Sequence, residues 1–133
     1  MSEAPPDGDA WTMKLMTPER RRDPAHDLYD AACELLLAAQ ALRAAAGARG
    51  AAPSFAATVG CLDTSLEALA EAVDSMRDEA ARAVARAGRP DGAGSAEAAR
   101  REFSELVAAL DAAHRGAGRM RERVGPMLAR LTL

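Results

Sequence analysis

The chain is poor in aromatic residues and carries no excess of positive charge. Aromatic side chains make up 3% of its 133 residues, so a core has to be built from Leu, Val, Met and Ala, which favours thin, closely packed helices. The formal net charge is −3 at pH 7. Because there is no broad positive field to hold a polyphosphate backbone, nucleic acid is not an expected partner. Alanine and arginine are abundant and lysine is rare, a composition that GC-rich bacterial genomes also produce.

The chain also lacks long apolar runs and has only two cysteines. No stretch of roughly eighteen uncharged apolar residues is present, and residues 1–9 are acidic and polar, unlike a signal peptide. We therefore expect no membrane segment and a cytoplasmic location. Hairpin pairing of the predicted helices leaves Cys33 and Cys61 roughly 10 Å apart along the axis, which excludes a disulfide. Two free thiols agree with a reducing compartment.

Two long segments repeat apolar residues at alternating steps of four and three. The first set is Phe55, Val59, Leu62, Leu66, Leu69, Val73, Met76, Ala80, Ala83 and Ala87. The second set is Ala99, Phe103, Leu106, Leu110, Ala113, Ala117, Met120, Val124, Met127 and Leu131. This spacing places each set on one stripe of an α-helix, which is typical of coiled-coil-like helices that pack side by side at a shallow angle.

A shorter amphipathic segment precedes these two. Asp23 is a favourable N-cap, Pro24 is tolerated at the first helical position, and the helix is expected to end near Gly47. The seam of this helix is Leu28, Ala32, Leu35, Ala39, Leu42 and Ala46. Four more side chains widen its apolar face: Tyr29, Cys33, Leu36 and Leu37.

These patterns predict three helices and an irregular N-terminal arm. The helices are expected at about 24–46, 53–87 and 95–124, with a short helical extension to 131. Ser95 is the expected cap of the third helix, and Gly125 with Pro126 should kink or break it. Residues 1–22 lack helical periodicity. The predicted fold class is all-α: an antiparallel three-helix bundle over residues 23–133, with two long helices and one shorter one.

The difference in helix length carries the main functional hypothesis. The far end of the two long helices, from about Met76 to Phe103, has no third helix to cover it. Met76, Phe103 and Leu106 are large enough to anchor a contact there, either with the arm through Trp11 or with a second copy. No nucleophile elbow, phosphate-binding loop, dinucleotide fingerprint or Cys-x-x-Cys motif is present. We therefore expect a non-enzymatic interaction or scaffold protein, a homodimer or a partner of another helical protein, without a cofactor.

Charged residues follow the same geometry. An acidic stripe runs beside the seam of the second helix: Asp63, Glu67, Glu71, Asp74 and Asp78. Arginines gather near the end of the third helix: Arg115, Arg119, Arg121, Arg123 and Arg130. An antiparallel hairpin brings the two sets opposite each other, so we expect solvated cross-helix ion pairs that help to select the antiparallel register.

A first alternative is a bundle that binds a metal ion or a small ligand. His26 and His114 each end a D-x-x-H pair, which projects a carboxylate and an imidazole from one helix face. Hairpin pairing brings both histidines to the level of two acidic residues of the second helix. The candidate ligands are His26, His114, Glu71, Asp74 and Asp111.

A second alternative rests on the six residues from Ala113 to Gly118. An exposed histidine with a glycine one turn later, as at His114 and Gly118, resembles the phosphoacceptor helix of histidine phosphotransfer domains. The resemblance implies that His114 accepts a phosphoryl group. That family has a basic residue three positions after the histidine, where this chain has Ala117, so Arg115 or Arg119 would have to take its place.

Overall fold

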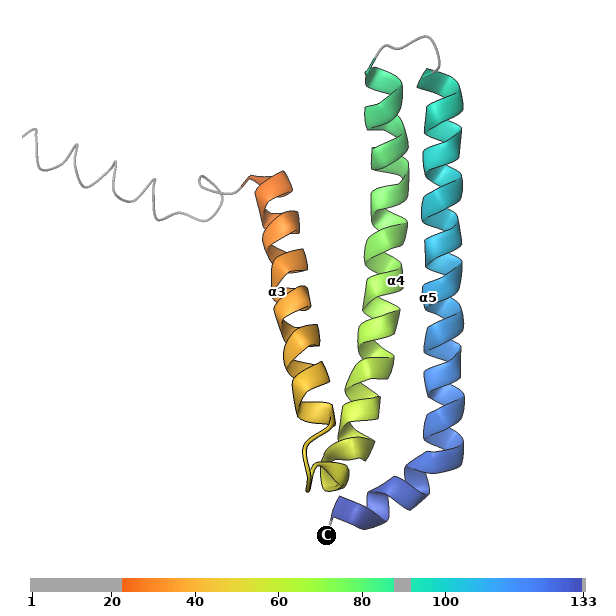
Figure 1. The fold of residues 1–133 in the computed structure, drawn as a ribbon. Helices are drawn as coiled ribbons and strands as arrows, with labels where there is room; N and C mark the ends of the chain where they lie inside the picture. Colours follow the sequence, from red (N-terminus) through yellow and green to blue (C-terminus); the bar gives the residue numbers. More distant parts are fainter. Residues whose placement is uncertain (1–22, 88–91, 133) are drawn as a thin grey trace, which may run out of the picture. The chain divides into compact units, whose positions relative to one another are not determined.

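The computed structural model describes residues 23–87 and 92–132, and the predicted arm with Trp11 lies outside these residues. The described residues form three α-helices, two short 3-10 turns and connecting turns, with no strand among them. The all-α class, with two long helices and one shorter one, is therefore confirmed (Figure 1). The described residues belong to two separate units, one that ends at Ala48 and one that begins at Arg49.

The first unit contains α3, which spans Pro24–Ala46. The Asp23 carboxylate caps its N-terminus by accepting a hydrogen bond from the amide of Ala25 at 3.1 Å, and Pro24 occupies the first turn, as the sequence predicts. The helix ends at Gly47, whose amide donates to the carbonyl of Ala45. Cap, proline and glycine thus set both ends of this element.

The second unit begins with a 3-10 turn, η1 (Ala52–Ser54), which leads into α4 (Phe55–Arg86). Gly50 precedes the turn with φ of 84°, a conformation that a side chain disfavours. Ser54 does not cap α4 with its side chain; its hydroxyl donates back to the carbonyl of Ala51 at 2.8 Å. The chain therefore turns at Gly50 and starts its first long helix at Phe55.

The last long helix, α5, spans Gly92–Ala129 and begins three residues before the predicted cap Ser95. Gly92 is buried, and an added Cβ there would lie 3.7 Å from the carbonyl oxygen of Ala85. Ala96, one turn later, is buried as well. Packing of these small residues against the end of α4 outweighs the weak helix propensity of glycine, so the helix starts earlier than its capping signal indicates.

Pro126 lies inside α5, and the helix bends near its C-terminal end (Figure 1). A proline in a helix removes one backbone hydrogen bond and clashes with the preceding turn, so the predicted kink has its expected cause. The chain continues as a 3-10 turn, η2 (Arg130–Thr132), which packs against η1. The bend thus returns the end of α5 to the start of α4.

Helices α4 and α5 pack side by side as an antiparallel hairpin (Figure 1). The register is visible in two cross-helix ion pairs, Arg121 with Asp63 at 2.8 Å and Arg100 with Asp78 at 3.9 Å. Four apolar side chains are buried among the described residues: Ala70, Val73, Ala81 and Ala96. Three of these are alanines, so the two backbones approach closely while little apolar area is buried.

The contact between α4 and α5 is rotated from the predicted seams. The large seam residues that are exposed are Leu62, Leu106, Met120, Met127 and Leu131. The rotation brings Ala70 and Ala81 into the contact, because small side chains allow the closest approach of two helices. It also brings in Asp63, which the sequence assigns to a solvated stripe.

Among the residues described, no helix combines the length and the apolar character that a membrane crossing requires.

Candidate functional site

A cluster of charged residues lies inside the contact between α4 and α5. Asp63 of α4 is the buried polar residue of the described chain, and two basic side chains of α5 reach its carboxylate. The guanidinium of Arg121 donates from Nη1 to Oδ2 at 2.8 Å. His114 lies on the other side, with Nδ1 at 2.5 Å from Oδ1 and 3.1 Å from the main-chain carbonyl oxygen of Asp63. One carboxylate therefore joins two residues of the facing helix.

The spacing along each helix explains why these groups meet. His114 and Arg121 are seven residues apart, which is two turns and places both on one face of α5. Glu67 is one turn beyond Asp63 on α4, and its Oε2 lies 3.6 Å from Nε2 of His114. The imidazole is thus held between two acidic residues of α4, with Nδ1 toward the buried one and Nε2 toward the exposed one.

The electrostatics of the cluster favour an ionised Asp63. The hydrogen bond from Arg121 lowers the pKa of the Asp63 carboxyl below its usual value, and the charges of His114 and Arg121 act in the same direction. Burial opposes this effect by raising the pKa, and the net shift is downward. The hairpin therefore carries a carboxylate at its contact surface at neutral pH.

Next to His114 lies a surface groove, here called the acidic groove. Its walls come from both long helices and consist of Glu67, Ala70, Glu71, Asp74, Val107, Asp111 and His114. Four of the five predicted metal ligands are among them, so the prediction that His114 lies level with Glu71 and Asp74 describes this region well. Asp74 itself pairs along its own helix, with the guanidinium of Arg77 at 2.7 Å.

The fifth predicted ligand, His26, belongs to α3 in the other unit. Its Nδ1 lies 3.6 Å from Oδ2 of Asp23, so the first D-x-x-H pair forms as a local, exposed contact. In residues 23–87 and 92–132, no three His, Cys, Asp or Glu side chains are arranged to hold a metal ion. The metal site remains a prediction from the sequence.

The glycines after His114 leave open space on α5. A Cβ added at Gly118 would meet no atom within 4 Å, and one at Gly116 would lie 3.6 Å from Nη2 of Arg119. Nε2 of His114, however, faces the acidic groove, where Oε2 of Glu67 lies 3.6 Å away. Carboxylates beside Nε2 repel a phosphoryl group and attract a cation or a hydrogen-bond donor. The resemblance to phosphotransfer domains therefore gains no support from the charges around the histidine.

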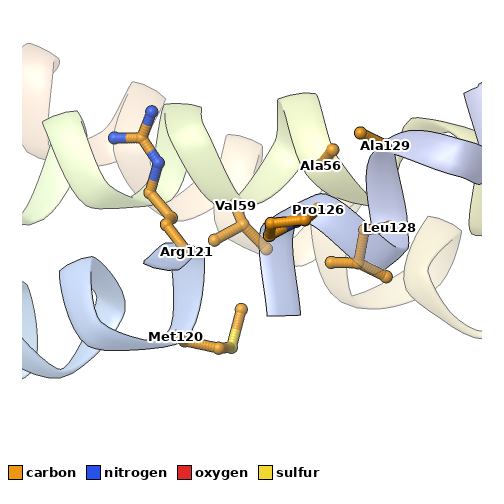
Figure 2. A pocket seen from close by; sticks show the side chains of 8 residues that line it. Ala56, Val59, Met120, Arg121, Pro126, Leu128 and Ala129 are labelled. Atoms are coloured by element: carbon orange, nitrogen blue, oxygen red, sulfur yellow. The ribbon is translucent and has the colours of Figure 1, made fainter. Parts of the chain in front are cut away.

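A second pocket lies at the base of the hairpin, where α5 bends. It is lined by Ala56, Val59, Met120, Arg121, Gly125, Pro126, Leu128 and Ala129. Figure 2 shows Val59, Pro126 and Leu128 around this space, with the guanidinium of Arg121 directed away from it. The walls are mainly apolar, and the bend at Pro126 shapes them.

The three residues that the sequence predicts as contact anchors at the far end of the hairpin differ in burial. Met76 and Phe103 are half-buried, whereas Leu106 is exposed. Both cysteines are free, with Cys33 half-buried and Cys61 exposed.

Sequence reasoning assigned Asp63 and Arg121 to solvated stripes and did not single out their contact with His114. A usable signal was present. Asp63 lies four residues after Val59 and three before Leu66, so it continues the four-three spacing of apolar residues in a second register. A lone carboxylate in an apolar series indicates a buried charge with a basic partner on the facing helix.

The cluster can fix the ring of His114 between Asp63 and Glu67. Oδ1 and the main-chain carbonyl oxygen of Asp63 both lie near Nδ1, so a ring proton at Nδ1 has two acceptors there. Comparison of the chain with protein families, with curated proteins and with solved structures gives no match in any of the three.

Proposed function

We propose that this chain is a non-enzymatic helical interaction module that associates with a second copy through apolar helix faces. One observation carries the proposal: among the described residues, the buried apolar side chains are three alanines and Val73. Large apolar side chains remain at the surface of all three helices. A protein of this kind gains stability by covering those faces, and a second copy offers the same faces in return.

The hairpin alone leaves an apolar surface that association would remove from water. Leu62 on α4 and Leu106, Met120 and Met127 on α5 are its exposed large residues. Full burial of such a side chain contributes about 1.5–3 kcal/mol, so covering the exposed parts of four contributes several kcal/mol. Leu106 is the predicted contact residue that projects outward and is the hairpin's candidate anchor.

The location proposed for this module is the cytoplasm. Cys33 and Cys61 are both free thiols, and free thiols persist where the cellular redox buffers keep them reduced. The proposed partner is a second copy of the chain, because its own exposed leucines and methionines can cover those of the first copy.

Sedimentation equilibrium of the full chain tests the proposal directly. A mass of two copies that falls to one copy on dilution is expected. If the mass stays that of one copy at every concentration up to about 100 μM, the proposal is overturned. Circular dichroism at the same concentrations establishes that the sample is helical, so a monomer cannot be attributed to unfolding.

A further inference from the structure

Three exposed arginines in the second half of α5 have no ion pair among the residues that the structure describes. They are Arg115, Arg119 and Arg123, here called the outer arginines. Five other arginines of the two long helices each contact a carboxylate: Arg77, Arg82, Arg86, Arg100 and Arg121. The outer arginines therefore carry positive charge that the described part of the hairpin leaves uncompensated.

The register of the hairpin explains why these side chains are unpaired. Arg121 faces α4, where it binds Asp63. Arg119 and Arg123 are each two residues from Arg121, which is about 200° around the helix, so they point away from α4. Residues 53–62 also contain no acidic residue, and residues 115–132 contain five arginines and one glutamate. The predicted cross-helix ion pairing thus holds for Arg121 and not for the outer arginines.

The acidic groove, in contrast, has an excess of negative charge. Neither Glu71 nor Asp111 has an ion pair within the described ranges, and the carboxylate of Glu67 contacts the imidazole of His114. Ala70 and Val107 add apolar surface to the walls. The volume of the groove is about 340 Å³. A water molecule takes about 30 Å³ in the liquid, so a guanidinium group fits inside. Arginine suits such walls, because its methylene groups pack on apolar surface while its guanidinium binds carboxylates.

We propose that the outer arginines of one copy dock on the acidic groove of a second copy. The outer arginines follow one another at steps of four residues, as do Glu67 and Glu71, so both rows repeat about every 6 Å. The two surfaces cannot meet within one hairpin, because Arg123 and Asp111 are separated by roughly 18 Å along the same helix. An unrelated anionic partner would pair with the arginines alone, whereas a second copy also pairs with the carboxylates of the groove.

This contact goes beyond the proposed function, because it uses charged surfaces and not the apolar face around Leu106. It joins two different surfaces, so it is heterologous, and each copy offers one surface to each of two neighbours. Exposed ion pairs are individually weak, so the contact is expected at high protein concentration and low salt.

Salt dependence is the first test. The distance over which charges act falls from about 30 Å at 0.01 M salt to about 3 Å at 1 M. Sedimentation equilibrium of the full chain should therefore give a larger mass at the lower salt concentration. The dissociation constant of the contact should rise more than about tenfold between the two conditions.

Charge reversal on each surface gives a sharper test. One variant combines Arg119→Glu with Arg123→Glu, and the other combines Glu67→Arg with Glu71→Arg. All four side chains are exposed, and circular dichroism checks that both variants remain helical. In 0.01 M salt each variant alone should lose the additional mass, because its two surfaces carry charge of the same sign. An equimolar mixture should regain it, because the intact groove of the first variant meets the intact arginines of the second.

A matched control separates this contact from an effect of net charge. Arg43→Glu combined with Arg101→Glu makes the same change in charge at two exposed arginines outside the row. The dissociation constant in this control should stay within about threefold of the wild-type value at both salt concentrations.

The outcomes separate this inference from the proposed function. An equal wild-type mass at both salt concentrations overturns the charged contact, as expected if residues outside the described ranges cover the arginines. The proposed function then stands if that mass is two copies. A mixture no heavier than its two components also overturns the contact. A wild-type chain that is one copy at 1 M salt and heavier at 0.01 M supports the charged contact and overturns the apolar association.

Discussion

Asp63 favours one register of α4 against α5 over registers that are shifted by one turn. Alanines such as Ala70, Ala81 and Ala96 recur along both helices, so a shift of one turn would still bring small residues together. The same shift would separate the buried carboxylate from Arg121 and His114. An unpaired buried charge is costly, whereas a shifted alanine is not, so the charged cluster sets the register that the apolar residues leave open.

The pH dependence of stability should reveal the charge on Asp63. Asp63→Asn removes the anion that binds Arg121 and His114, so it should lower the midpoint of urea unfolding at pH 7. The pKa of Asp63 is lowered in the folded protein, so its contribution is complete above the unfolded value of about 3.9 and is lost as the pH decreases through the lower folded value. The difference in unfolding midpoint between the wild type and Asp63→Asn should therefore become smaller below about pH 4.

Asp74→Asn is the matched control for this substitution. Its carboxylate is exposed and pairs with Arg77 on the same helix, so it should change the unfolding midpoint little at either pH. Equal decreases of the unfolding midpoint in the two variants at pH 7 would show that burial of Asp63 does not increase its contribution to stability.

His114 offers a second measurement at the same site. Because Asp63 presents two oxygens to Nδ1, the neutral ring of His114 should carry its proton there, and nitrogen-detected NMR distinguishes this tautomer from the Nε2 form. In Asp63→Asn the preference of His114 for the Nδ1-protonated tautomer should weaken. His26 is an internal reference in each spectrum, and its tautomer should not respond to the substitution. An Nε2-protonated His114 in the wild type would contradict the geometry of the cluster.

Part of this cluster could be predicted from the sequence. The three-residue spacing identified His114 and Asp111 as one helix face, and hairpin pairing placed both near Glu71 and Asp74 in what is the acidic groove. Asp63 was missed because its neighbours in sequence, Leu62 and Leu66, dominate the apolar pattern. Which edge of a broad apolar stripe faces the partner depends on how closely two backbones can approach, and that is decided by side chains on both helices together.

At the scale of the element, glycine substitutions separate backbone propensity from packing. Gly118 lies inside α5 with no atom within 4 Å of an added Cβ, so Gly118→Ala should stabilise the chain by roughly 0.5–1 kcal/mol. Gly50→Ala is the opposite case, because φ of 84° disfavours a side chain and should cost about 1–2 kcal/mol. Urea unfolding followed by circular dichroism measures both. A loss of stability in Gly118→Ala would mean that the open face there is occupied by a partner.

The helices themselves were predictable to different degrees. Both ends of α3 follow local signals, since Asp23 caps its start and Gly47 ends it. The start of α5 does not follow its local signal at Ser95, because the buried contact of Gly92 with the end of α4 is a tertiary effect. The kink at Pro126 was predictable because its cause is the missing backbone amide, which depends on no other part of the chain.

At the scale of the whole molecule, the balance between buried and exposed apolar residues governs the stability of the folded chain. The alanine-rich contact of α4 with α5 lets the two long helices run close together, but alanine buries little area. The leucines and methionines that would contribute more lie on the outer edges of the hairpin and around α3. Stability of the folded chain should therefore depend on association as well as on its own core.

Thermal unfolding at several protein concentrations tests this dependence. If dimerisation stabilises the folded chain, the midpoint of unfolding rises with total concentration, because only the folded state binds the second copy. Each tenfold increase in free partner above the dissociation constant adds about 1.4 kcal/mol per binding event. In Leu106→Glu, which replaces the candidate anchor of the hairpin surface by a charge, the dependence of the midpoint on concentration should weaken. A wild-type midpoint that does not change over a hundredfold range would show that the monomer is stable on its own, with its apolar faces left in water.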